Sequence, residues 1–290
     1  MSRHTAWQIW SQATTAWTNV VSPHDEENIM QWQATDDFHE KQGRSTGRLV
    51  LGEGKLIIYL KRHWKLPWWQ GLLARWWPHH PWSPGAQEWQ RLQWAKSQGF
   101  NVPEPLAMGQ IVGPGCKLQS YLAIRELTGM LALHQAIPMA YAQMPATQFD
   151  LWKHKLLERM AAIARQLHRL NHYHKDLYLC HYYVNEPSVQ QTDPGELALI
   201  DLHRLGEHRW FGLRWQIKDL AQLFFSMWGV AGLEGADRLT FFQHYRQKQN
   251  LSRSDQWLFL AAMRKAERYA HHNGVSTELA LDTNSRNQAA

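Results

Sequence analysis

The part of the sequence that most constrains the fold runs from residue 149 to residue 201. Its first portion predicts one long amphipathic helix, because apolar residues recur at every third or fourth position: Phe149, Trp152, Leu156, Met160, Ile163, Leu167 and Leu170. The polar and aromatic segment HYHKDLYLCHYYV, residues 172–184, follows directly. A turn then leads to the apolar run LALID, which predicts a short buried strand ending in Asp201. We therefore expect a loop of charged residues between a helix and a strand.

The segment HYHKDLYLCHYYV has three possible interpretations. A zinc site is disfavoured because His172, His174 and His181 are spaced by two and seven residues, whereas ligands on one helical face recur at three or four. A packed strand would bury the adjacent Lys175 and Asp176, which is costly for charged side chains. A catalytic loop accommodates both the charged and the aromatic residues, and this interpretation is favoured.

The first half of the chain has the pattern of a small β-sheet. Two apolar runs in GRLVLGEGKLIIYLK, residues 47–61, are joined by Gly-Glu-Gly and predict a hairpin. Trp89, Leu92 and Ala95 recur at helical spacing after a Pro-Gly pair, and further strands are expected over residues 106–112 and 120–127. The sequence thus predicts an α+β chain. It has an N-terminal extension over 1–40, a small sheet lobe with one helix over 41–126 and a larger, mainly helical lobe over 127–290.

Four charged residues stand in the order that kinase-fold phosphotransferases require. Lys61 ends a predicted strand, and Glu88 lies in the predicted helix that follows. Asp176 lies in the loop after the long helix, and Asp201 ends the next strand. In kinases the strand lysine and helix glutamate hold the nucleotide, the loop aspartate positions the attacking hydroxyl, and the strand aspartate binds magnesium. Each residue type is common alone, but the four in this order indicate a kinase.

The chain resembles the lipopolysaccharide core heptose(I) kinases, a branch of the protein-kinase-like superfamily, in the motifs HKDLYLCHYYV, LIDLHR, RWQIKDLAQLFFS, LKRHWKLPWWQGLLA, GAQEWQRL and RKAERY. The resemblance extends from Glu40 to Tyr269. It implies a bilobal kinase-like fold, ATP with Mg²⁺, and phosphorylation of the first heptose of the lipopolysaccharide inner core. Related Kdo kinases carry Asn where His181 stands, so the resemblance is to the heptose branch.

The resemblance implies which residues would bind ATP. Lys61 would contact the α- and β-phosphates and serve catalysis, and Glu88 would pair with Lys61 to fix its position. Ser45 and Thr46 would cover the phosphates, although their segment QGRSTGR lacks a complete glycine-rich motif. Glu126 would also contribute to the nucleotide site.

The resemblance also implies the catalytic and metal-binding residues. Asp176 would accept or orient the proton of the acceptor hydroxyl, with Lys175 close to the developing phosphate charge. Asp201 would bind Mg²⁺. His181 is a second candidate metal residue, but Mg²⁺ prefers oxygen ligands, so His181 is alternatively a hydrogen-bond partner of Asp176 or of a phosphate. Two residues would support the loop structurally: His174 and Asp219.

Composition adds expectations about partners and location. The formal net charge of +6 and the pI near 9.3 favour acidic partners. No RNP-like or zinc-finger pattern is present, so nucleic acid is not an expected partner. The two cysteines, Cys116 and Cys180, form no CxxC motif and predict a reducing compartment. The N-terminal segment has no apolar region typical of a signal peptide, and no window reaches 18 apolar residues. We expect a cytoplasmic protein, peripheral at the inner membrane.

Tryptophan is concentrated in one segment. Six of the 17 tryptophans lie between Trp64 and Trp82, among Lys65, Arg75 and three prolines. Tryptophan with lysine and arginine is typical of the membrane–water interface, which favours contact with lipid. The alternatives are an aromatic cluster in the core and a binding site for an acidic protein partner that carries an acyl chain.

The segment after Asp201 departs from the protein kinases. His203 and Arg204 replace the usual Phe-Gly, and no Ala-Pro-Glu segment follows, so a protein substrate is not expected. Arg204, Arg209 and Arg214 either line a site for an acidic glycolipid or form a solvated basic loop. Two functional alternatives stay open: a Kdo or other small-molecule kinase on the same fold, and a catalytically silent, membrane-associated scaffold.

Overall fold

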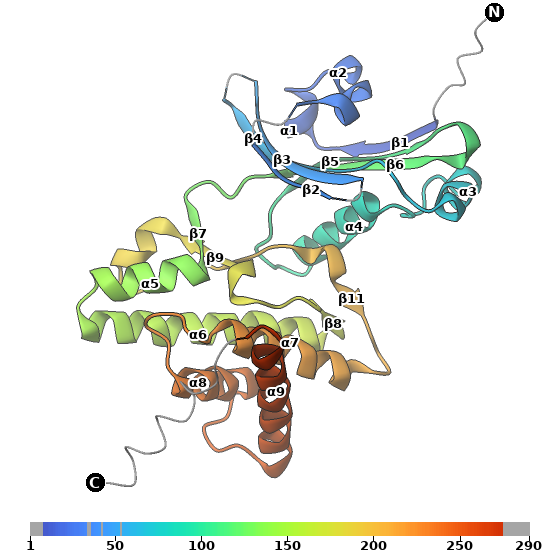
Figure 1. Ribbon diagram of the computed structural model, residues 1–290. Helices are drawn as coiled ribbons and strands as arrows, with labels where there is room; N and C mark the ends of the chain where they lie inside the picture. Colours follow the sequence, from blue (N-terminus) through green and yellow to red (C-terminus); the bar gives the residue numbers. More distant parts are fainter. Residues whose placement is uncertain (1–7, 34–35, 42, 53, 275–290) are drawn as a thin grey trace, which may run out of the picture. The chain divides into compact units, whose positions relative to one another are not determined.

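The hairpin predicted over residues 47–61 is present and belongs to a six-stranded antiparallel sheet (Figure 1). The structure is a computed structural model that describes residues 8–33, 36–41, 43–52 and 54–274. The chain divides into two compact units, residues 1–128 and 129–290. The sheet of the first unit has the order β1-β5-β6-β4-β3-β2, where the strands are β1 (Gln8–Ala13), β2 (Asp36–Lys41), β3 (Arg44–Leu51), β4 (Leu56–His63), β5 (Pro105–Val112) and β6 (Leu118–Arg125).

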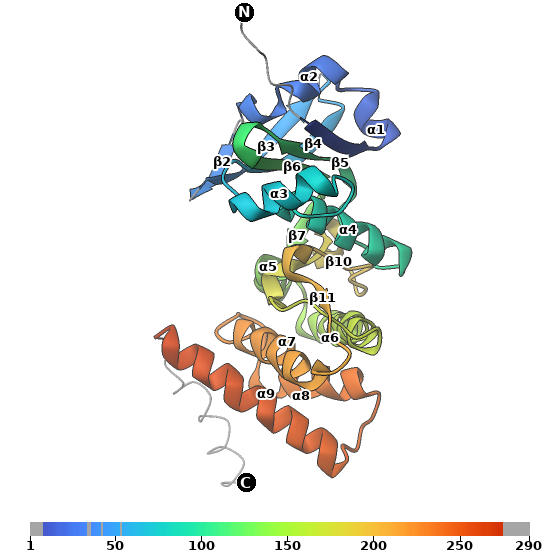
Figure 2. The ribbon, with the colours of Figure 1, turned by 90° about the vertical axis from the view of Figure 1, so that its right-hand side faces the viewer.

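Short helices cover both faces of this sheet. On one face lie α1 (Thr15–Thr18), α2 (Pro23–Glu27) and the 3₁₀ turn Ile29–Gln31, and on the other lie α3 (Trp68–Trp76) and α4 (Pro84–Ser97) (Figures 1 and 2). Strand β4 alternates strictly between more and less buried residues, as a strand with two different faces does. Ile58 and Leu60 point to the side of α1, so Lys61 lies on the face that α4 covers.

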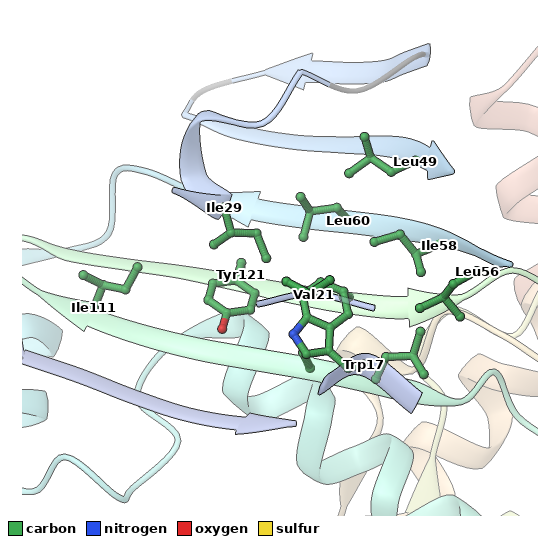
Figure 3. Packing of buried hydrophobic residues seen from close by; sticks show 12 residues of the cluster. Trp17, Val21, Ile29, Leu49, Leu56, Ile58, Leu60, Ile111 and Tyr121 are labelled. Carbon is green, nitrogen blue, oxygen red and sulfur yellow. The ribbon is translucent and has the colours of Figure 1, made fainter. Parts of the chain in front are cut away.

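The main core of the first unit lies between the sheet and the N-terminal helices (Figure 3). Trp17 and Ile29 are completely buried there against Ile58 and Leu60. Residues 1–40 are predicted to be an extension, but part of that segment belongs to the sheet and its core, because β1 pairs with β5 along its whole length. The composition of residues 1–40 did not indicate that this segment joins the sheet, because the segment is mostly polar. Its contribution to the core comes from a few apolar residues, among them Trp17 and Ile29.

The helix predicted around Trp89, Leu92 and Ala95 is α4, and these three residues are buried. Ser83 caps its first turn by accepting a hydrogen bond from the backbone N–H of Ala86 at 3.3 Å. The helix ends next to Gly99, whose φ of 80° reverses the chain. The predicted helix is therefore confirmed, and Glu88 is presented from a rigid element.

The second unit is mainly helical. Its elements are β7 (Met130–Ala132), α5 (Leu133–Gln143), α6 (Ala146–Arg169), β8 (His172–Tyr173), β9 (Tyr182–Asn185), β10 (Ala198–Leu199), β11 (Gly206–Glu207), α7 (Gly212–Ser226), α8 (Gly235–Arg246) and α9 (Arg253–His272). Helix α6 packs on α8, and α7 packs on α9 (Figure 2). Over residues 129–274, its strands pair in two small sheets, β10-β9-β7 and β11-β8.

The long helix predicted from Phe149 to Leu170 is α6, which buries Phe149, Trp152, Leu156, Met160 and Leu167. The strand predicted at the run LALID is reduced to Ala198 and Leu199, because only these two residues pair with β9. The prediction of a small antiparallel sheet followed by a mainly helical part is confirmed. Within the described residues, no helix combines the length and apolar character needed to cross a membrane.

Candidate active site

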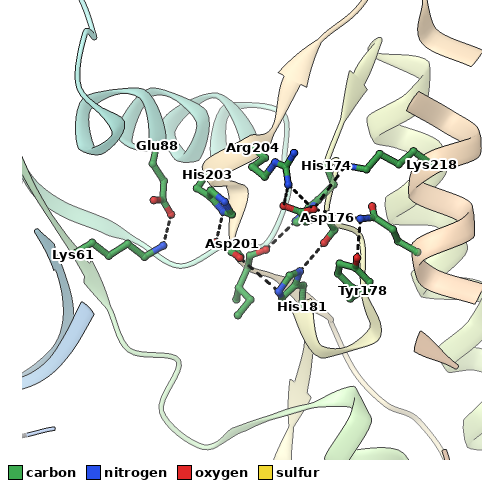
Figure 4. Close-up of polar contacts among 12 residues, drawn as sticks. Lys61, Glu88, His174, Asp176, Tyr178, His181, Asp201, His203, Arg204 and Lys218 are labelled. Carbon is green, nitrogen blue, oxygen red and sulfur yellow. Dashed lines mark hydrogen bonds and ion pairs between the residues drawn. The ribbon is translucent and has the colours of Figure 1, made fainter. Parts of the chain in front are cut away.

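In the first unit, Lys61 and Glu88 form a close ion pair. The Nζ atom of Lys61, on β4, lies 2.6 Å from Oε1 of Glu88, on α4 (Figure 4). The Glu88 side chain is only 6% exposed, whereas that of Lys61 is 22% exposed. A buried carboxylate that holds a more accessible ammonium fixes the direction of the lysine without covering it completely. This is the geometry expected of a lysine that must meet an anionic ligand.

The two hydroxyl residues predicted to cover phosphates lie on opposite faces of the sheet. Thr46 is the cross-strand partner of Lys61, so the two side chains share a face. Ser45 is opposite Arg62 instead, is buried, and accepts a hydrogen bond from the Arg62 guanidinium at 3.3 Å. Of the two, only Thr46 is presented beside Lys61.

Glu126 follows the last residue of β6 and is held by Arg48. The guanidinium donates two hydrogen bonds to the carboxylate, at 2.7 and 3.0 Å. These bonds hold the pKa of Glu126 below its usual range. The carboxylate of Glu126 is therefore charged and engaged with Arg48, while its backbone N–H donates to the Ile57 carbonyl at 2.9 Å.

In the second unit, Asp219 organises the loop that contains Asp176. Asp219 lies on α7, is completely buried, and accepts hydrogen bonds from the backbone N–H groups of His174 at 2.8 Å and Lys175 at 2.7 Å. Lys175 has a φ of 68°, a left-handed conformation that costs a non-glycine residue about 1 kcal/mol or more. The two bonds to Asp219 stabilise this turn, and the turn directs Asp176 into the loop.

Two histidines complete this buried support. His168 lies with Nε2 3.3 Å from Asp219 and Nδ1 2.8 Å from the Tyr245 hydroxyl. His174 is fully buried, and burial lowers its pKa, so the ring is neutral and donates from Nε2 to the Ile200 carbonyl at 2.9 Å. That bond ties the loop to the residue before Asp201.

The carboxylate of Asp176 is surrounded by donors from two other elements (Figure 4). Nη1 of Arg204 lies 3.1 Å from both carboxylate oxygens, and Nε2 of Gln222 lies 3.3 Å from one of them. The Nζ atom of Lys218 is 3.8 Å from the same oxygen and donates a hydrogen bond to the Lys175 carbonyl. Burial, and then the nearby Arg204 charge, lower the pKa of Lys218.

Lys218 is a site residue that the sequence analysis missed. The loop has no lysine or arginine between Asp176 and His181. The lysine near the Asp176 carboxylate comes instead from α7, where Lys218 precedes Asp219. A lysine directly before Asp219 in the helical motif RWQIKDLAQLFFS was the signal that would have found it. The predicted Lys175 instead has its ammonium 5.0 Å from the centre of the Trp215 ring, a cation–π contact.

Asp201, His181 and His203 form a second group in this unit. Asp201 has the left-handed φ of 62°, and its carboxylate lies 2.7 Å from Nδ1 of His203 and 3.6 Å from Nε2 of His181. The other His181 nitrogen, Nδ1, donates to the Asp176 carbonyl at 2.7 Å. His181 therefore touches both aspartate residues.

The environment of His181 favours its charged form. Burial would lower the pKa of the ring, but the Cys180 sulfur, the Asp176 carbonyl and the Asp201 carboxylate outweigh burial, and the pKa lies above its usual value. A protonated imidazole has no free lone pair for a metal ion. The contacts thus fit His181 better as a hydrogen-bond partner of the two aspartates than as a metal ligand.

The donor set fits a magnesium ion that is held mostly by a nucleotide. Asp201 offers one carboxylate that is 30% exposed. Across the part of the chain that the structure describes, no group of three or more His, Cys, Asp or Glu side chains is placed to hold a metal ion alone. Mg²⁺ commonly binds through one or two carboxylates together with substrate phosphates and water, so a single carboxylate is sufficient protein ligation.

Replacing His181 with asparagine tests its role. We expect kcat for phosphate transfer to fall about tenfold to a hundredfold, because the shorter amide cannot span from the Asp176 carbonyl to Asp201. The free energy of unfolding should change by only about 1 kcal/mol, the net value of one hydrogen bond. Steady-state kinetics and urea denaturation give the two values. A large loss of stability with unchanged kcat would mean that the ring serves packing against His174 and Tyr178 alone.

The Trp-rich segment from Trp64 to Trp82 is largely on the surface. Helix α3 exposes Trp68 by 70%, Trp69 by 47% and Trp76 by 70%, and Trp77 after it is 60% exposed. Trp82 is partly buried and packs against a small cluster that includes Leu118. The interpretation of the segment as a core cluster is therefore wrong for the four exposed indoles.

Comparisons with known proteins agree in pointing to one family. A family model described as "Lipopolysaccharide kinase (Kdo/WaaP) family" matches residues 31–262. The chain is 27% identical over 234 residues to "Lipopolysaccharide core heptose(I) kinase WaaP" of Pseudomonas aeruginosa, and this match covers 80% of the chain and 85% of that protein. It is 26% identical over 159 residues to the protein of the same name from Escherichia coli (strain K12), covering 55% of the chain and 58% of that protein.

A solved structure shares the fold. The structure titled "WaaP in complex with acyl carrier protein" matches with a TM-score of 0.69 and 24% sequence identity, and the match covers 89% of this chain and 98% of that chain. At this identity the likeness concerns the fold alone. It agrees with the antiparallel sheet of the first unit and the helical second unit described above.

Proposed function

The chain belongs to the lipopolysaccharide kinase (Kdo/WaaP) family, and from this membership we propose that it transfers a phosphate group from ATP to heptose I of the lipopolysaccharide inner core. Membership makes the protein a phosphotransferase, and ATP is the phosphate donor expected of a kinase. The observation that carries the chemistry is the loop in which buried Asp219 accepts hydrogen bonds from the backbone N–H groups of His174 and of the left-handed Lys175, the residue before Asp176.

The residues of the first unit would bind the nucleotide. Lys61, held by Glu88, would contact the phosphates of ATP, and Thr46 lies on the same face of the sheet. Positioning and charge stabilisation supply most of the catalysis in phosphoryl transfer, so a rigid ion pair suits this task. Ser45 and Glu126 are engaged with Arg62 and Arg48, and would act on the nucleotide through the strands that carry them.

The loop of the second unit would act on the acceptor. The heptose hydroxyl oxygen attacks the γ-phosphorus, the bond to the β–γ bridging oxygen breaks, and ADP leaves. Asp176 would orient the hydroxyl and accept its proton. Arg204 and Lys218, the cations at this carboxylate, would stabilise the negative charge that develops on the transferred group. Lys175, over Trp215, would support the loop.

Magnesium would be held by Asp201, with His181 and His203 orienting its carboxylate. When bound, the ion would neutralise part of the negative charge on the phosphates. The chain's own contribution is to keep Asp201 in its left-handed conformation beside the two imidazoles.

A transfer assay with defined acceptors tests the function. Purified protein, ATP and Mg²⁺ are incubated with delipidated core oligosaccharide from cells that lack this gene, and tandem mass spectrometry locates the new phosphate. We expect it on heptose I. Phosphate on Kdo would establish the alternative within the same family, and no transfer to any core sugar would favour the catalytically silent scaffold.

We also propose that the Trp-rich segment brings the enzyme to the cytoplasmic face of the inner membrane. The exposed indoles of Trp68, Trp69, Trp76 and Trp77 are accompanied by Arg75 in the last turn of α3. Next to them, a hollow of about 620 Å³ is lined by Trp76, Trp77 and Pro81 among others. An acidic acyl-bearing protein is the second candidate for this surface, because the solved structure of similar fold is a complex with acyl carrier protein.

Replacing Trp68, Trp69, Trp76 and Trp77 with serine separates these two partners. One large apolar side chain moved out of water is worth about 2 kcal/mol, so the variant should bind anionic vesicles more than about tenfold more weakly. Transfer to a membrane-embedded acceptor should slow, while transfer to the delipidated sugar should not. Vesicle sedimentation and both assays are compared with wild type. Unchanged vesicle binding with lost binding of acyl carrier protein would assign the segment to the protein partner.

A further inference from the structure

A second amphipathic surface lies on the second unit, between α7 and α9. A hollow of about 510 Å³ opens between these helices, and its apolar floor includes Leu213, Ile217 and Trp257. On α9 the core-facing positions are taken by Leu258, Ala262, Ala266 and Ala270. Trp257 is 55% exposed, so this face of the helix is apolar without being part of the core. We call the surface the α7–α9 groove.

Four cations border the α7–α9 groove: Arg214 from α7, and Arg264, Lys265 and Arg268 from α9. None of the four lies within ion-pairing distance of a carboxylate on any residue that the structure describes. Burial, followed by the charges of Arg268 and Arg214, lowers the pKa of Lys265. Arg268 and Arg214 therefore repel the Lys265 ammonium, and a bound anion would relieve that repulsion.

Other cations of this unit are arranged differently. Arg246 and Lys248 both contact Asp255, at 2.5 and 3.2 Å, and Arg159 contacts Asp193 at 2.6 Å. Asp255 and Asp193 thus neutralise three cations of this unit. The groove cations gain no such carboxylate among the described residues, and four of them line one hollow.

Large apolar side chains continue the floor outside the groove. Trp210 and Phe211, just before α7, are 92% and 74% exposed, and Leu260 on α9 is about half exposed. Single exposed apolar residues are common on protein surfaces, but an exposed tryptophan that lines a hollow together with four cations without carboxylate partners among the described residues is not explained by the fold. The combination of indole, aliphatic and cationic groups matches the chemistry of the boundary between lipid headgroups and acyl chains.

We propose that the α7–α9 groove docks on an anionic phospholipid surface. Arg264, Lys265 and Arg268 contact lipid phosphates, while Trp210 and Trp257 lie at headgroup depth. Lipid is favoured over a protein because the apolar groups project from the chain instead of forming a closed pocket, and a bilayer accepts projecting rings without shape complementarity. The proposal goes beyond phosphate transfer and concerns a different surface from the Trp-rich segment, so it holds or fails independently of both.

Vesicle binding by the full-length protein tests the proposal. The probes are vesicles of phosphatidylcholine alone and of phosphatidylcholine with about 30 mol% phosphatidylglycerol, which gives an anionic surface. The variant is Arg264→Ser with Arg268→Ser. A cation near an anionic surface is worth about 1 kcal/mol, so the pair should weaken binding to the anionic vesicles about thirtyfold.

A matched control carries the same change of net charge elsewhere. Lys55 and Arg169 are exposed, and neither forms an ion pair with another described residue, so Lys55→Ser with Arg169→Ser removes two cations outside the groove. This control should bind within about threefold of wild type, because neither residue lines the groove and all four groove cations are retained. A second variant, Trp210→Ser, removes an exposed indole without a charge and should weaken binding severalfold.

Phosphate transfer serves as the control for folding, and vesicle binding decides whether the groove contacts lipid. All three variants should retain wild-type phosphate transfer to delipidated acceptor, which also shows that they are folded. Wild-type vesicle binding by the arginine variant, or an equal loss in the control, would overturn the proposal. Loss of binding to acyl carrier protein with vesicle binding intact would identify the groove as a protein-docking surface and would likewise overturn it. Failure of phosphate transfer in the wild type concerns the proposed function only, since vesicle binding requires no ATP.

Discussion

Replacing Asp176 with asparagine is expected to lower kcat for phosphate transfer about a thousandfold, the usual contribution of a positioned proton acceptor. Asparagine keeps the size of the side chain and can still accept from Arg204 and Gln222, which contact Asp176 at 3.1 and 3.3 Å. The free energy of unfolding should therefore change by only about 1 kcal/mol. Rapid-quench transfer kinetics and urea denaturation measure the two effects.

Asp193→Asn is the matched control for this experiment. Asp193 is also a carboxylate of the second unit paired with an arginine, Arg159, at 2.6 Å, but it has no proposed part in the chemistry. The control should keep wild-type kcat. If Asp176→Asn retained more than about a tenth of the activity, proton acceptance by this residue would be wrong, because even the lower limit for such a group is about a hundredfold.

Replacing Asp219 with alanine should cause the largest loss of stability. The change removes the acceptor for the backbone N–H groups of His174 and Lys175, and for His168, in a completely buried place. Each buried donor left unpaired costs about 1–3 kcal/mol, so we expect a loss of about 4 kcal/mol. Urea unfolding should show a lower midpoint with an unchanged slope.

Asp219→Asn separates the hydrogen bonds from the charge. The amide oxygen can still accept from one or both N–H groups, so this variant should recover about half of the lost stability. Because Lys175 would no longer be held in its left-handed conformation, Asp219→Ala should also lose transfer activity. A loss of stability below about 1 kcal/mol in the alanine variant would contradict the role of Asp219 as the support of the loop.

The elements that the sequence predicted well are those set by local pattern. The hairpin of β3 and β4, the helix α4 and the long helix α6 each carry their own local periodicity. The order of Lys61, Glu88, Asp176 and Asp201 along these elements could therefore be read from the sequence. The Lys61–Glu88 contact, which the resemblance implied, is present at 2.6 Å.

The remaining features depend on contacts between distant residues. The left-handed turn at Lys175 is stabilised by Asp219, and the donors at Asp176 come from Arg204 and Lys218, all outside the loop. No local pattern contains these distances. The different environments of Ser45 and Thr46 could have been anticipated, because neighbouring residues of a strand face opposite sides of the sheet. The roles of all these residues in catalysis stay predictions until the variants are measured.

The pairing of β1 with β5 has a consequence for how the protein is made. Ala13 pairs with Ala107, and Trp17 is buried in a core that needs β5 and β6 as well. Strand β1 therefore leaves the ribosome long before its partner strand β5 is synthesised. Apolar residues after β1, such as Trp17 and Ile29, stay exposed to solvent until most of the first unit has been made. Closing so long a loop is entropically slow. We expect nascent chains to depend on chaperones during this interval, and changes in β1 to affect yield more than the activity of molecules that fold.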